Sequence, residues 1–249
     1  MKASFIIRFH SKRLNNLNQT LRFLEKWHRN VISESQLVLV CQDSTDRIPN
    51  GFERYDHFNL EIDCMRLPRL TNFGVEKSLS EKVVLLDGDR IAPAGYYQRI
   101  LNQIEEGKVF SIKTMKNLSC PTEDWEIETG KYDYIMEERG HTTPGQRCMW
   151  SGNTTFMKTD FYRVGMMDED YKGYGFEDQD MSLTIEKHDI KQILIDEEEI
   201  HLWHERKTYG IGDQKQLFID NGLKFCKKWD IPFPEFFREE IANHKKAWI

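Results

Sequence analysis

The segment VVLLDGD (residues 83–89) joins an uninterrupted apolar run to two acidic residues. Two other apolar runs, at residues 4–9 (SFIIRF) and 36–41 (QLVLVC), also contain β-branched residues, and the leucine spacing after the first of them is helical. Near-continuous apolar runs with helices between them are typical of strands that are covered on both faces of a parallel sheet. The sequence therefore predicts an α/β fold with one mostly parallel central sheet and helices on both faces.

Polar residues follow each of these three runs: the segment HSKR at 10–13, then Asp43, then the pair Asp87 and Asp89. Open α/β sheets bind ligands beyond the carboxyl ends of their parallel strands, so we expect these residues to converge on one crevice. Two carboxylates two residues apart can hold a divalent cation, which would neutralise a diphosphate. Acidic pairs of this kind also occur in ordinary loops, and the strand before this pair is what favours a metal site.

Two histidines, His201 and His204, follow a strand-like run at residues 192–195 (QILI). Imidazole added to carboxylate and phosphate oxygens suits Mn(II) better than Mg(II). A structural role is the alternative for His201. The acidic run at residues 196–199 (DEEE) is predicted to be a solvated turn.

Residues 173–180 (GYGFEDQD) place two glycines and three carboxylates directly before a helix-like run at 181–188 (MSLTIEKH). Acidic side chains in the first turn of a helix are stabilised by its free N–H groups and its dipole. This segment is therefore a suitable seat for a carboxylate base. The alternative is an acidic cap on an ordinary surface helix.

The composition bounds the class of protein. With 249 residues, 39% of them hydrophobic, the chain can bury the core of one large domain or of a domain with an appendage. The formal charge of −6 argues against a nucleic-acid partner. No apolar run reaches the ~20 residues that span a bilayer, and residues 1–13 have too short an apolar centre for a secretory signal, so a cytoplasmic protein is expected. The five cysteines share no close spacing, which favours reduced, mostly buried thiols.

The order of these motifs resembles that of the metal-dependent, inverting GT-A glycosyltransferases. DGD at 87–89, WSGN at 150–153, YGFEDQD at 174–180 and HLWHE at 201–205 are similar to motifs of the catalytic half of β-1,4-galactosyltransferase-type enzymes and of bacterial relatives of the chondroitin-polymerase type. LTNFG at 70–74 is similar to the family's L-x-N-x-G, and FHSKR at 9–13 lies where the family has a basic nucleotide-binding loop.

The resemblance implies a GT-A fold, which has a single Rossmann-like, mostly parallel central sheet with helices on both faces. It implies a glycosyltransferase domain over residues 1–213, with a nucleotide-binding half at 1–110 and an acceptor and catalytic half at 111–213, followed by a helical extension at 214–249. The implied reaction is inverting transfer of a hexose or N-acetylhexosamine from a UDP-sugar to a saccharide hydroxyl, in the synthesis of a polysaccharide or other surface glycan.

The resemblance also implies roles for the acidic segment. Asp178 would be the catalytic base, and Glu177 would hold a sugar hydroxyl. The acceptor sugar would contact Trp150, Tyr174, Phe176 and Gln179. This sequence departs from the family here, because Tyr174 replaces a tryptophan, Phe176 a glycine and Gln179 a carboxylate, so the acceptor stays open.

For the metal, Mn(II) or alternatively Mg(II), the resemblance implies Asp89 and His204 as ligands, with help from Asp87 and His201. The nucleotide would contact residues near the strand ends: Arg8, His10, Arg13, Asp43, Asn72, Asp87 and Gly152. His10 and Lys12 stand where the family would have arginines.

Residues 205–213, which contain two glycines, are predicted to fold over bound donor, a plain surface loop being the alternative. Residues 214–249 predict two amphipathic helices that pack on the domain or on another subunit, or that rest on an anionic membrane where lipid-linked acceptors lie. Two other functions stay open. A sugar-phosphate nucleotidyltransferase would need a glycine-rich phosphate loop, which RFHSKR (8–13) lacks, and an inactive sugar-binding module would keep the aromatics.

Overall fold

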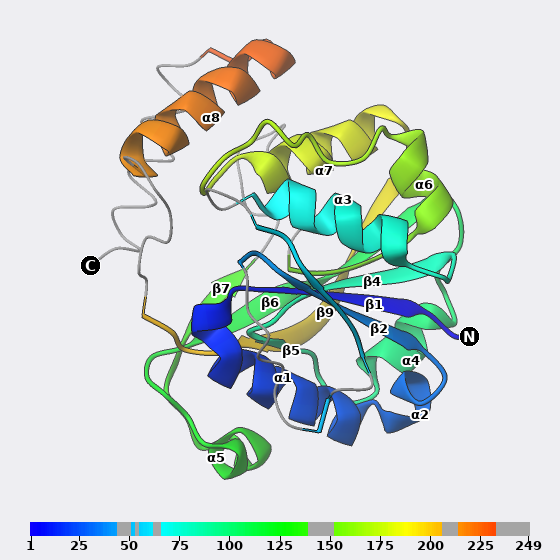
Figure 1. Ribbon diagram of the computed structural model, residues 1–249, viewed down its shortest axis with the longest axis vertical. Helices are drawn as coiled ribbons and strands as arrows, with labels where there is room; N and C mark the ends of the chain where they lie inside the picture. The colour runs from blue at the N-terminus through cyan, green and yellow to red at the C-terminus, as the bar shows by residue number, and fades with distance from the viewer. Residues whose placement is uncertain (44–50, 53–54, 62–65, 139–151, 206–213, 233–249) are drawn as a thin grey trace.

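The structure of the chain, a computed structural model, describes residues 1–43, 51–52, 55–61, 66–138, 152–205 and 214–232. The strands that these residues form belong to one sheet, and helices cover both of its faces (Figure 1). The strand order is β3-β2-β1-β4-β8-β6-β9-β5, and β7 pairs with β6.

The first half of the sheet is parallel. Its strands are β1 (Ser4–Phe9), β2 (Gln36–Cys41), β3 (Asp56–Asn59) and β4 (Lys82–Asp87). Along β1 every residue is buried, because Phe5 and Ile7 face one hydrophobic core while Ile6 faces the other. Burial on both faces is the physical reason why these strands read as continuous apolar runs.

The second half of the sheet is mixed. Its strands are β5 (Arg90–Ile91), β6 (Lys108–Leu118), β7 (Tyr134–Glu138), β8 (Asn153–Met157) and β9 (Lys191–His201). β8 runs antiparallel to both β4 and β6, β7 is antiparallel to β6, and β5 is antiparallel to β9, whereas β6 and β9 are parallel. The predicted α/β class with helices on both faces is confirmed, and its parallel character is concentrated in strands β1 to β4.

Two sets of helices sandwich the sheet. The helices are α1 (Leu14–Trp27), α2 (Arg29–Ile32), α3 (Leu67–Lys77), α4 (Tyr96–Leu101), α5 (Asp124–Thr129), α6 (Lys158–Arg163), α7 (Glu177–Lys187) and α8 (Gln214–Trp229), with a short 3-10 turn, η1 (Ser11–Arg13), before α1. Helices α1, α2 and α4 pack on one face, and α3, α6 and α7 on the other. Leu17, Leu21 and Leu24 of α1 are buried, as their helical spacing predicts.

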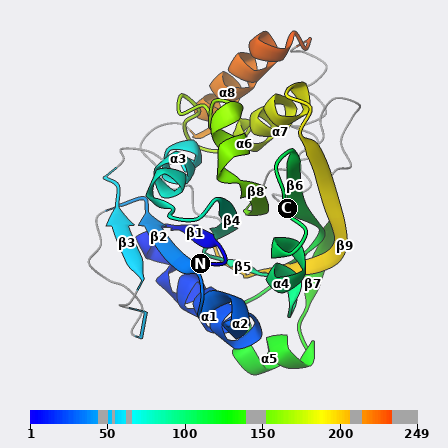
Figure 2. The ribbon, with the colours of Figure 1, turned by 90° about the vertical axis from the view of Figure 1, so that its right-hand side faces the viewer.

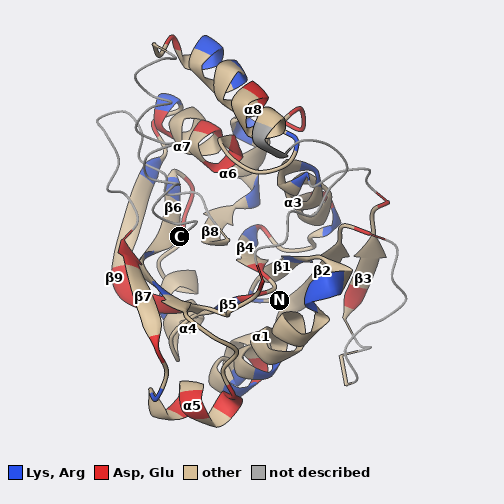
Figure 3. Cartoon of the chain, turned by 90° about the vertical axis from the view of Figure 1, so that its left-hand side faces the viewer, with Lys and Arg blue, Asp and Glu red and all other residues tan. Residues whose placement is uncertain are grey.

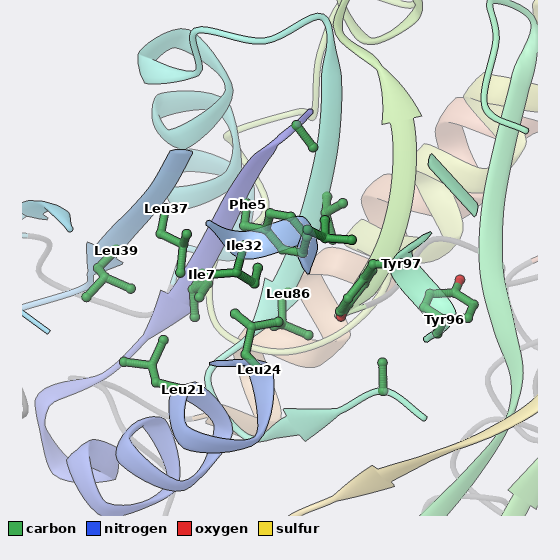
Figure 4. Close-up of a cluster of buried hydrophobic side chains, with 14 of the residues drawn as sticks. Phe5, Ile7, Leu21, Leu24, Ile32, Leu37, Leu39, Leu86, Tyr96 and Tyr97 are labelled. Carbon is green, nitrogen blue, oxygen red and sulfur yellow. The ribbon is translucent and has the colours of Figure 1, made fainter. Parts of the chain in front are cut away.

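Figure 4 shows the first of the two cores, where side chains of β1, β2 and β4 meet those of α1, α2 and α4. Phe5 packs edge to face on Tyr97, with ring centroids 4.9 Å apart. This core anchors the strands whose carboxyl ends carry the polar residues of the predicted crevice.

The prediction of a solvated turn at residues 196–199 is wrong. This acidic run lies inside β9, which pairs with β6 through a register shift next to Ile112. Glu199 is fully buried. Burial of this carboxylate is tolerated because Arg90 and Asn153, which are remote in sequence, contact its two oxygens.

Helix α8 lies beside α7 in both views of the ribbon (Figures 1 and 2). A small hydrophobic cluster joins Phe225 and Cys226 of α8 to Tyr171 and Phe176, which precede α7. The described part of the C-terminal segment therefore packs on the domain, while the second helix predicted there lies outside the described residues. The boundary at residue 213, like the division at residue 110, stays a prediction. No helix among the described residues is long and apolar enough to cross a bilayer.

Candidate metal and nucleotide site

The carboxyl ends of β1, β2 and β4 lie at one edge of the sheet. In the register of the sheet, Arg8 is opposite Asp87 and Phe9 is opposite Cys41. Just beyond the strands, the N–H of Gly88 donates to the carbonyl of Arg8 at 2.8 Å. The segment 10–13, Asp43 and the Asp87/Asp89 pair therefore meet at one edge, as predicted.

Asp89 is the centre of a cluster formed with the two histidines. One carboxylate oxygen, Oδ2, lies 3.7 Å from His201 Nε2 and 3.5 Å from His204 Nε2. Candidate ligand atoms of the three residues lie within 4.8 Å of one another. The cluster forms because β5 pairs with the end of β9, which puts Arg90 opposite His201, and because the N–H of Leu202 donates to the carbonyl of Asp89 at 2.9 Å.

The hydrogen-bond acceptors next to the two histidines set their tautomers. His201 Nδ1 lies 2.8 Å from Asn117 Oδ1, and His204 Nδ1 lies 3.2 Å from the carbonyl of Glu205. Both partners are acceptors, so each Nδ1 carries a proton, and each Nε2 is the ring nitrogen that faces Asp89. Burial, and then the charge of Arg13, lowers the pKa of His204, which keeps that ring neutral. One carboxylate and two imidazoles form a donor set that fits Mn(II) or a similar divalent ion.

Arg13 also binds Asp89, with Nη1 2.7 Å from the same Oδ2. Burial alone would raise the pKa of Asp89, but His201, Arg90 and Arg13 together hold that pKa well below its usual range. The side chain of Asp89 is only 6% exposed. The site is therefore an ionised, nearly buried carboxylate surrounded by nitrogen donors.

Asp87 lies beside this cluster and has a partner of its own. Arg8 Nε and Nη2 donate to Asp87 Oδ1 at 2.9 and 2.6 Å, and Arg8 Nη1 donates to Thr71 Oγ1 at 2.7 Å. A Cβ at Gly152 would lie 1.9 Å from Asp87 Oδ2, so the glycine lets the backbone pass directly over the carboxylate. The side chain of Arg8 is 1% exposed. The prediction that Arg8 contacts nucleotide is therefore corrected, because Arg8 lies beneath Asp87 and orients it.

Asp43 joins the end of β2 to the loop after β1. Its Oδ1 accepts from the N–H of Ser11 and from Cys41 Sγ, both at 3.0 Å, while its Oδ2 accepts from the hydroxyl of Ser11. Burial acts to raise the pKa of Asp43, but these hydrogen bonds lower it overall. His10 Nδ1 lies 3.7 Å from Asp43 Oδ2. Since a third of the Asp43 side chain is exposed, it is available to a ligand.

Asn72 has a structural position, which corrects its predicted role at the nucleotide. It is 4% exposed, its Nδ2 donates to the carbonyl of Met167 and to Glu169 Oε1, both at 2.9 Å, and its Oδ1 accepts from the N–H of Met167. These bonds tie α3 to the loop after α6.

The segment before α7 has an unusual backbone. Gly173, Gly175 and Phe176 have φ angles of 72°, 104° and 73°, and Phe176 occupies the N-cap position. Glu177 and Asp178 follow in the first turn of α7. Burial, and then the neighbouring charge of Asp178, raises the pKa of Glu177 to about 8, while Arg8 acts in the opposite direction. Glu177 is thus within electrostatic reach of Arg8.

The predicted acceptor contacts divide into three groups. Phe176 is 1% exposed and packs between Phe218 and Phe225, at centroid distances of 4.9 and 5.6 Å, so the prediction that it stacks on a sugar is corrected. Tyr174 is 50% exposed, and Gln179 is half-buried, so both can meet a ligand. Trp150 lies outside the described residues.

Helix α8 holds this segment in place, which the sequence did not indicate. Asn221 Nδ2 donates to the carbonyls of Lys172 and Gly175 at 2.8 and 3.1 Å. Lys228 Nζ and Trp229 Nε1 donate to the carboxylate of Asp180 at 2.7 and 2.8 Å.

A buried polar network behind the metal cluster was also missed. Glu199 Oε1 lies 3.3 Å from Arg90 Nη1, and its Oε2 accepts from Asn153 Nδ2 at 2.8 Å. Tyr97 donates its hydroxyl to Asn153 Oδ1 at 3.3 Å, while Arg90 Nε lies 3.9 Å from Asp89 Oδ1. The run of four acidic residues at 196–199 was the one sequence signal for this network. A carboxylate that is buried in a strand needs a polar partner, so the run could have indicated a buried partner for one of its members.

No family model and no curated protein matches this chain. Solved structures do match. The crystal structure of GalNAc-T7 with UDP, GalNAc and Mn2+ aligns with a TM-score of 0.65 at 13% identity, covering 90% of this chain and 47% of that one. TarS residues 1–349 of S. aureus in complex with UDP-GlcNAc aligns with a TM-score of 0.59 at 15% identity, covering 91% and 67%. The catalytic domain of Drosophila β1,4-galactosyltransferase 7 in complex with xylobiose aligns with a TM-score of 0.51 at 14% identity, covering 86% and 77%.

These likenesses span nearly the whole chain and include a galactosyltransferase of the type that the motifs resemble. The chain spans about half of the GalNAc-T7 chain and about two thirds of the TarS chain. The neighbours are glycosyltransferases of the GT-A class. The resemblance predicted from the order of the motifs is confirmed for the fold: the chain has the GT-A glycosyltransferase fold.

Proposed function

We propose that the chain is a metal-dependent, inverting glycosyltransferase that moves a hexose or N-acetylhexosamine from a UDP-sugar to a saccharide hydroxyl. The observation that carries the proposal is the convergence of Asp89, His201 and His204 at the end of β4, within 4.8 Å of one another. Support comes from the neighbours: GalNAc-T7 was crystallised with UDP and Mn2+, and TarS with UDP-GlcNAc. A polysaccharide or other surface glycan as the product belongs to the same proposal.

Different residues are proposed to bind the metal and the uridine. A divalent cation, Mn(II) rather than Mg(II) for this donor set, would be held by Asp89, His201 and His204 and would supply positive charge against the departing diphosphate. Asp43 is exposed enough to accept hydrogen bonds from the uridine. Asp87 would lie between the metal and the uridine, where hydrogen bonds from Arg8 orient its carboxylate.

Asp178 is the proposed base, and its neighbour supports the choice. Because burial and the neighbouring charge of Asp178 raise the pKa of Glu177 to about 8, Glu177 is protonated near neutral pH and is a poorer candidate for the base than Asp178. Asp178 would take the proton of the acceptor hydroxyl as that oxygen attacks the anomeric carbon on the face opposite the leaving diphosphate. Protonated Glu177 would donate a hydrogen bond to a sugar oxygen, and exposed Tyr174 would contact the acceptor.

Location is a further part of the proposal: the cytoplasm, with peripheral contact at the inner face of a membrane through the C-terminal segment. Figure 3 shows lysines along α8. Two of them, Lys224 and Lys228, bind Asp168 and Asp180 within the domain. Membrane contact therefore depends on exposed Lys227 and on residues 233–249, which lie outside the described part of the chain.

A thermal-shift panel tests the donor and the metal together. UDP-sugars and GDP-mannose, which a mannosyltransferase from Pyrobaculum calidifontis binds with Mn2+, would be added with and without Mn(II). A ligand at a hundred times its dissociation constant adds ~2.7 kcal/mol, or a rise of several degrees. We expect one donor to give a Mn(II)-dependent rise that Asp89→Ala abolishes. Asp196→Ala, which removes a carboxylate that is 92% exposed, is the matched control and keeps the rise.

The catalytic half is tested by Asp178→Asn. This variant is expected to keep the donor-dependent rise but to lose Mn(II)-dependent transfer and donor hydrolysis by at least about 100-fold. No rise with any nucleotide sugar in the presence of Mn(II) would refute the glycosyltransferase. Binding without turnover in the wild type, with a full panel of saccharide acceptors, would instead indicate an inactive sugar-binding module.

A further inference from the structure

Arg13 and the proposed metal ligands compete for one oxygen atom. Asp89 Oδ2 accepts from Arg13 Nη1 at 2.7 Å and also faces His201 Nε2 and His204 Nε2 at 3.7 and 3.5 Å. A metal ion bound by the aspartate and the histidines would take the position beside Oδ2 that the guanidinium now shares. Arg13 therefore acts as the counter-ion of Asp89 in this state.

A counter-ion is physically necessary here. The side chain of Asp89 is 6% exposed, and a nearly buried carboxylate without a cation is strongly unfavourable. Arg13 supplies such a cation, since its Nη1 lies 2.7 Å from Asp89 Oδ2. A divalent ion would satisfy the same charge. It would also repel a guanidinium that stayed within 3 Å of its ligand oxygen.

The side chain of Arg13 is placed so that it can leave Asp89 and bind a phosphate group. Arg13 lies at the end of η1, directly after β1, and 27% of its side chain is exposed. A planar guanidinium matches the oxygens of a phosphate in a two-pronged contact. The diphosphate of a bound nucleotide would lie beside the metal, within reach of this loop.

We propose that Arg13 is an exchangeable counter-ion, which neutralises Asp89 when the metal is absent and moves to the nucleotide diphosphate when a divalent cation takes Asp89. This inference rests on the proposed function, because it assumes the metal and a nucleoside diphosphate. This exchange makes the binding of the metal and of the nucleotide cooperative. The metal releases the Arg13 guanidinium from Asp89, so that it can bind the diphosphate. The diphosphate in turn keeps the guanidinium away from the metal. Such coupling is reciprocal, so UDP must raise the affinity for Mn(II) by the factor by which Mn(II) raises the affinity for UDP.

The test is Mn(II) affinity, measured from the electron paramagnetic resonance signal of the free ion, with and without saturating UDP. In Arg13→Gln, which keeps most of the side-chain length but removes the charge, we expect Mn(II) to bind about tenfold more tightly without UDP, and the gain from UDP to fall about tenfold. Arg13→Lys restores the charge without the two-pronged geometry. It should bind Mn(II) alone as the wild type does but gain less from UDP.

Lys131→Gln is the matched control, because it also replaces a positive charge by a glutamine, at an exposed residue outside the proposed metal and nucleotide sites. It should change neither quantity. Equal tightening in Lys131→Gln and Arg13→Gln would overturn the proposal, since the effect would then be general electrostatics. Unchanged Mn(II) affinity in Arg13→Gln would overturn it too.

Asp89→Ala separates this failure from that of the proposed function. If the wild type binds Mn(II) and Asp89→Ala does not, the metal site stands whatever Arg13 does. If the wild type binds no Mn(II), with or without UDP, both proposals fall. If Arg13→Gln does not fold, Arg13→Lys still tests the exchange against the wild type. If UDP raises the Mn(II) affinity of Arg13→Lys as much as that of the wild type, the exchange is overturned.

Discussion

Asn221→Ala is expected to loosen the segment that presents Asp178. The side chain of Asn221 is 4% exposed. It donates to the carbonyls of Lys172 and Gly175 at 2.8 and 3.1 Å and accepts from the N–H of Lys172 at 3.3 Å. Alanine removes all three hydrogen bonds between α8 and the segment before α7.

The magnitude follows from the number of bonds. Each contributes roughly 0.5–1.5 kcal/mol net, so their loss costs about 2–4 kcal/mol. Expressed as an opening equilibrium, 2–4 kcal/mol is about a 30- to 1000-fold change. The lower end of this range of free energies is expected if water takes the place of the Asn221 amide. Water can reach this point because Lys172 is at the surface.

Amide hydrogen exchange over residues 172–178 measures this opening directly. Lys227→Ala, which shortens an exposed side chain of the same helix, is the control and should leave the exchange unchanged. Transfer activity should fall in parallel with protection, because the segment carries the proposed base. An acceleration below about threefold in Asn221→Ala, or an equal one in Lys227→Ala, would refute the view that α8 positions this segment.

Three further predictions concern the interior of the domain. Gly152→Ala puts a Cβ 1.9 Å from Asp87 Oδ2 and should lower the free energy of unfolding by about 1–3 kcal/mol or more in denaturant titration, and wild-type stability would contradict the close approach. The raised pKa of Glu177 contributes stability that is complete below its unfolded value near 4.5 and is lost as the pH rises through about 8. Glu177→Gln should therefore gain on the order of 2–4 kcal/mol over the wild type at pH 9 and much less at pH 4.5, and equal gains at both pH values would show that burial does not govern this group. Burial raises the pKa of Cys41 to about 12 and Cys120 is exposed, so maleimide followed by peptide mapping should label Cys120 in the native protein while Cys41 stays unmodified until denaturation.

The parallel half of the fold was predictable because its signals are local. A strand buried on both faces must be apolar at nearly every position, and β1, β2 and β4 are. Strands that run in the same direction must also end at the same edge, which is why Asp43, Asp89 and the segment 10–13 could be placed together. The antiparallel strands were not predictable in this way, because β7 and β8 are recognised only by their pairing with β6.

Residue type was a poorer guide than residue position. Arg8, Asn72 and Phe176 have the chemistry of ligand-binding residues, yet the structure buries them beneath Asp87, between α3 and the loop after α6, and against α8. Whether such a side chain faces a ligand or the interior depends on which remote segments pack against it. No local sequence pattern records that packing.

The sequence by itself determined that an acidic pair follows a buried parallel strand and that an acidic segment begins a helix, because both are properties of consecutive residues. Only the tertiary structure decided that His201 and His204 face Asp89, since this depends on the pairing of β5 with β9 across more than a hundred residues. It alone also decided that Asn117 orients His201, that Arg13 neutralises Asp89 and that Asn221 holds the segment before Asp178. The physical reason is that each of these contacts joins residues remote in sequence, and such contacts form only when the whole sheet and its covering helices have closed around the core.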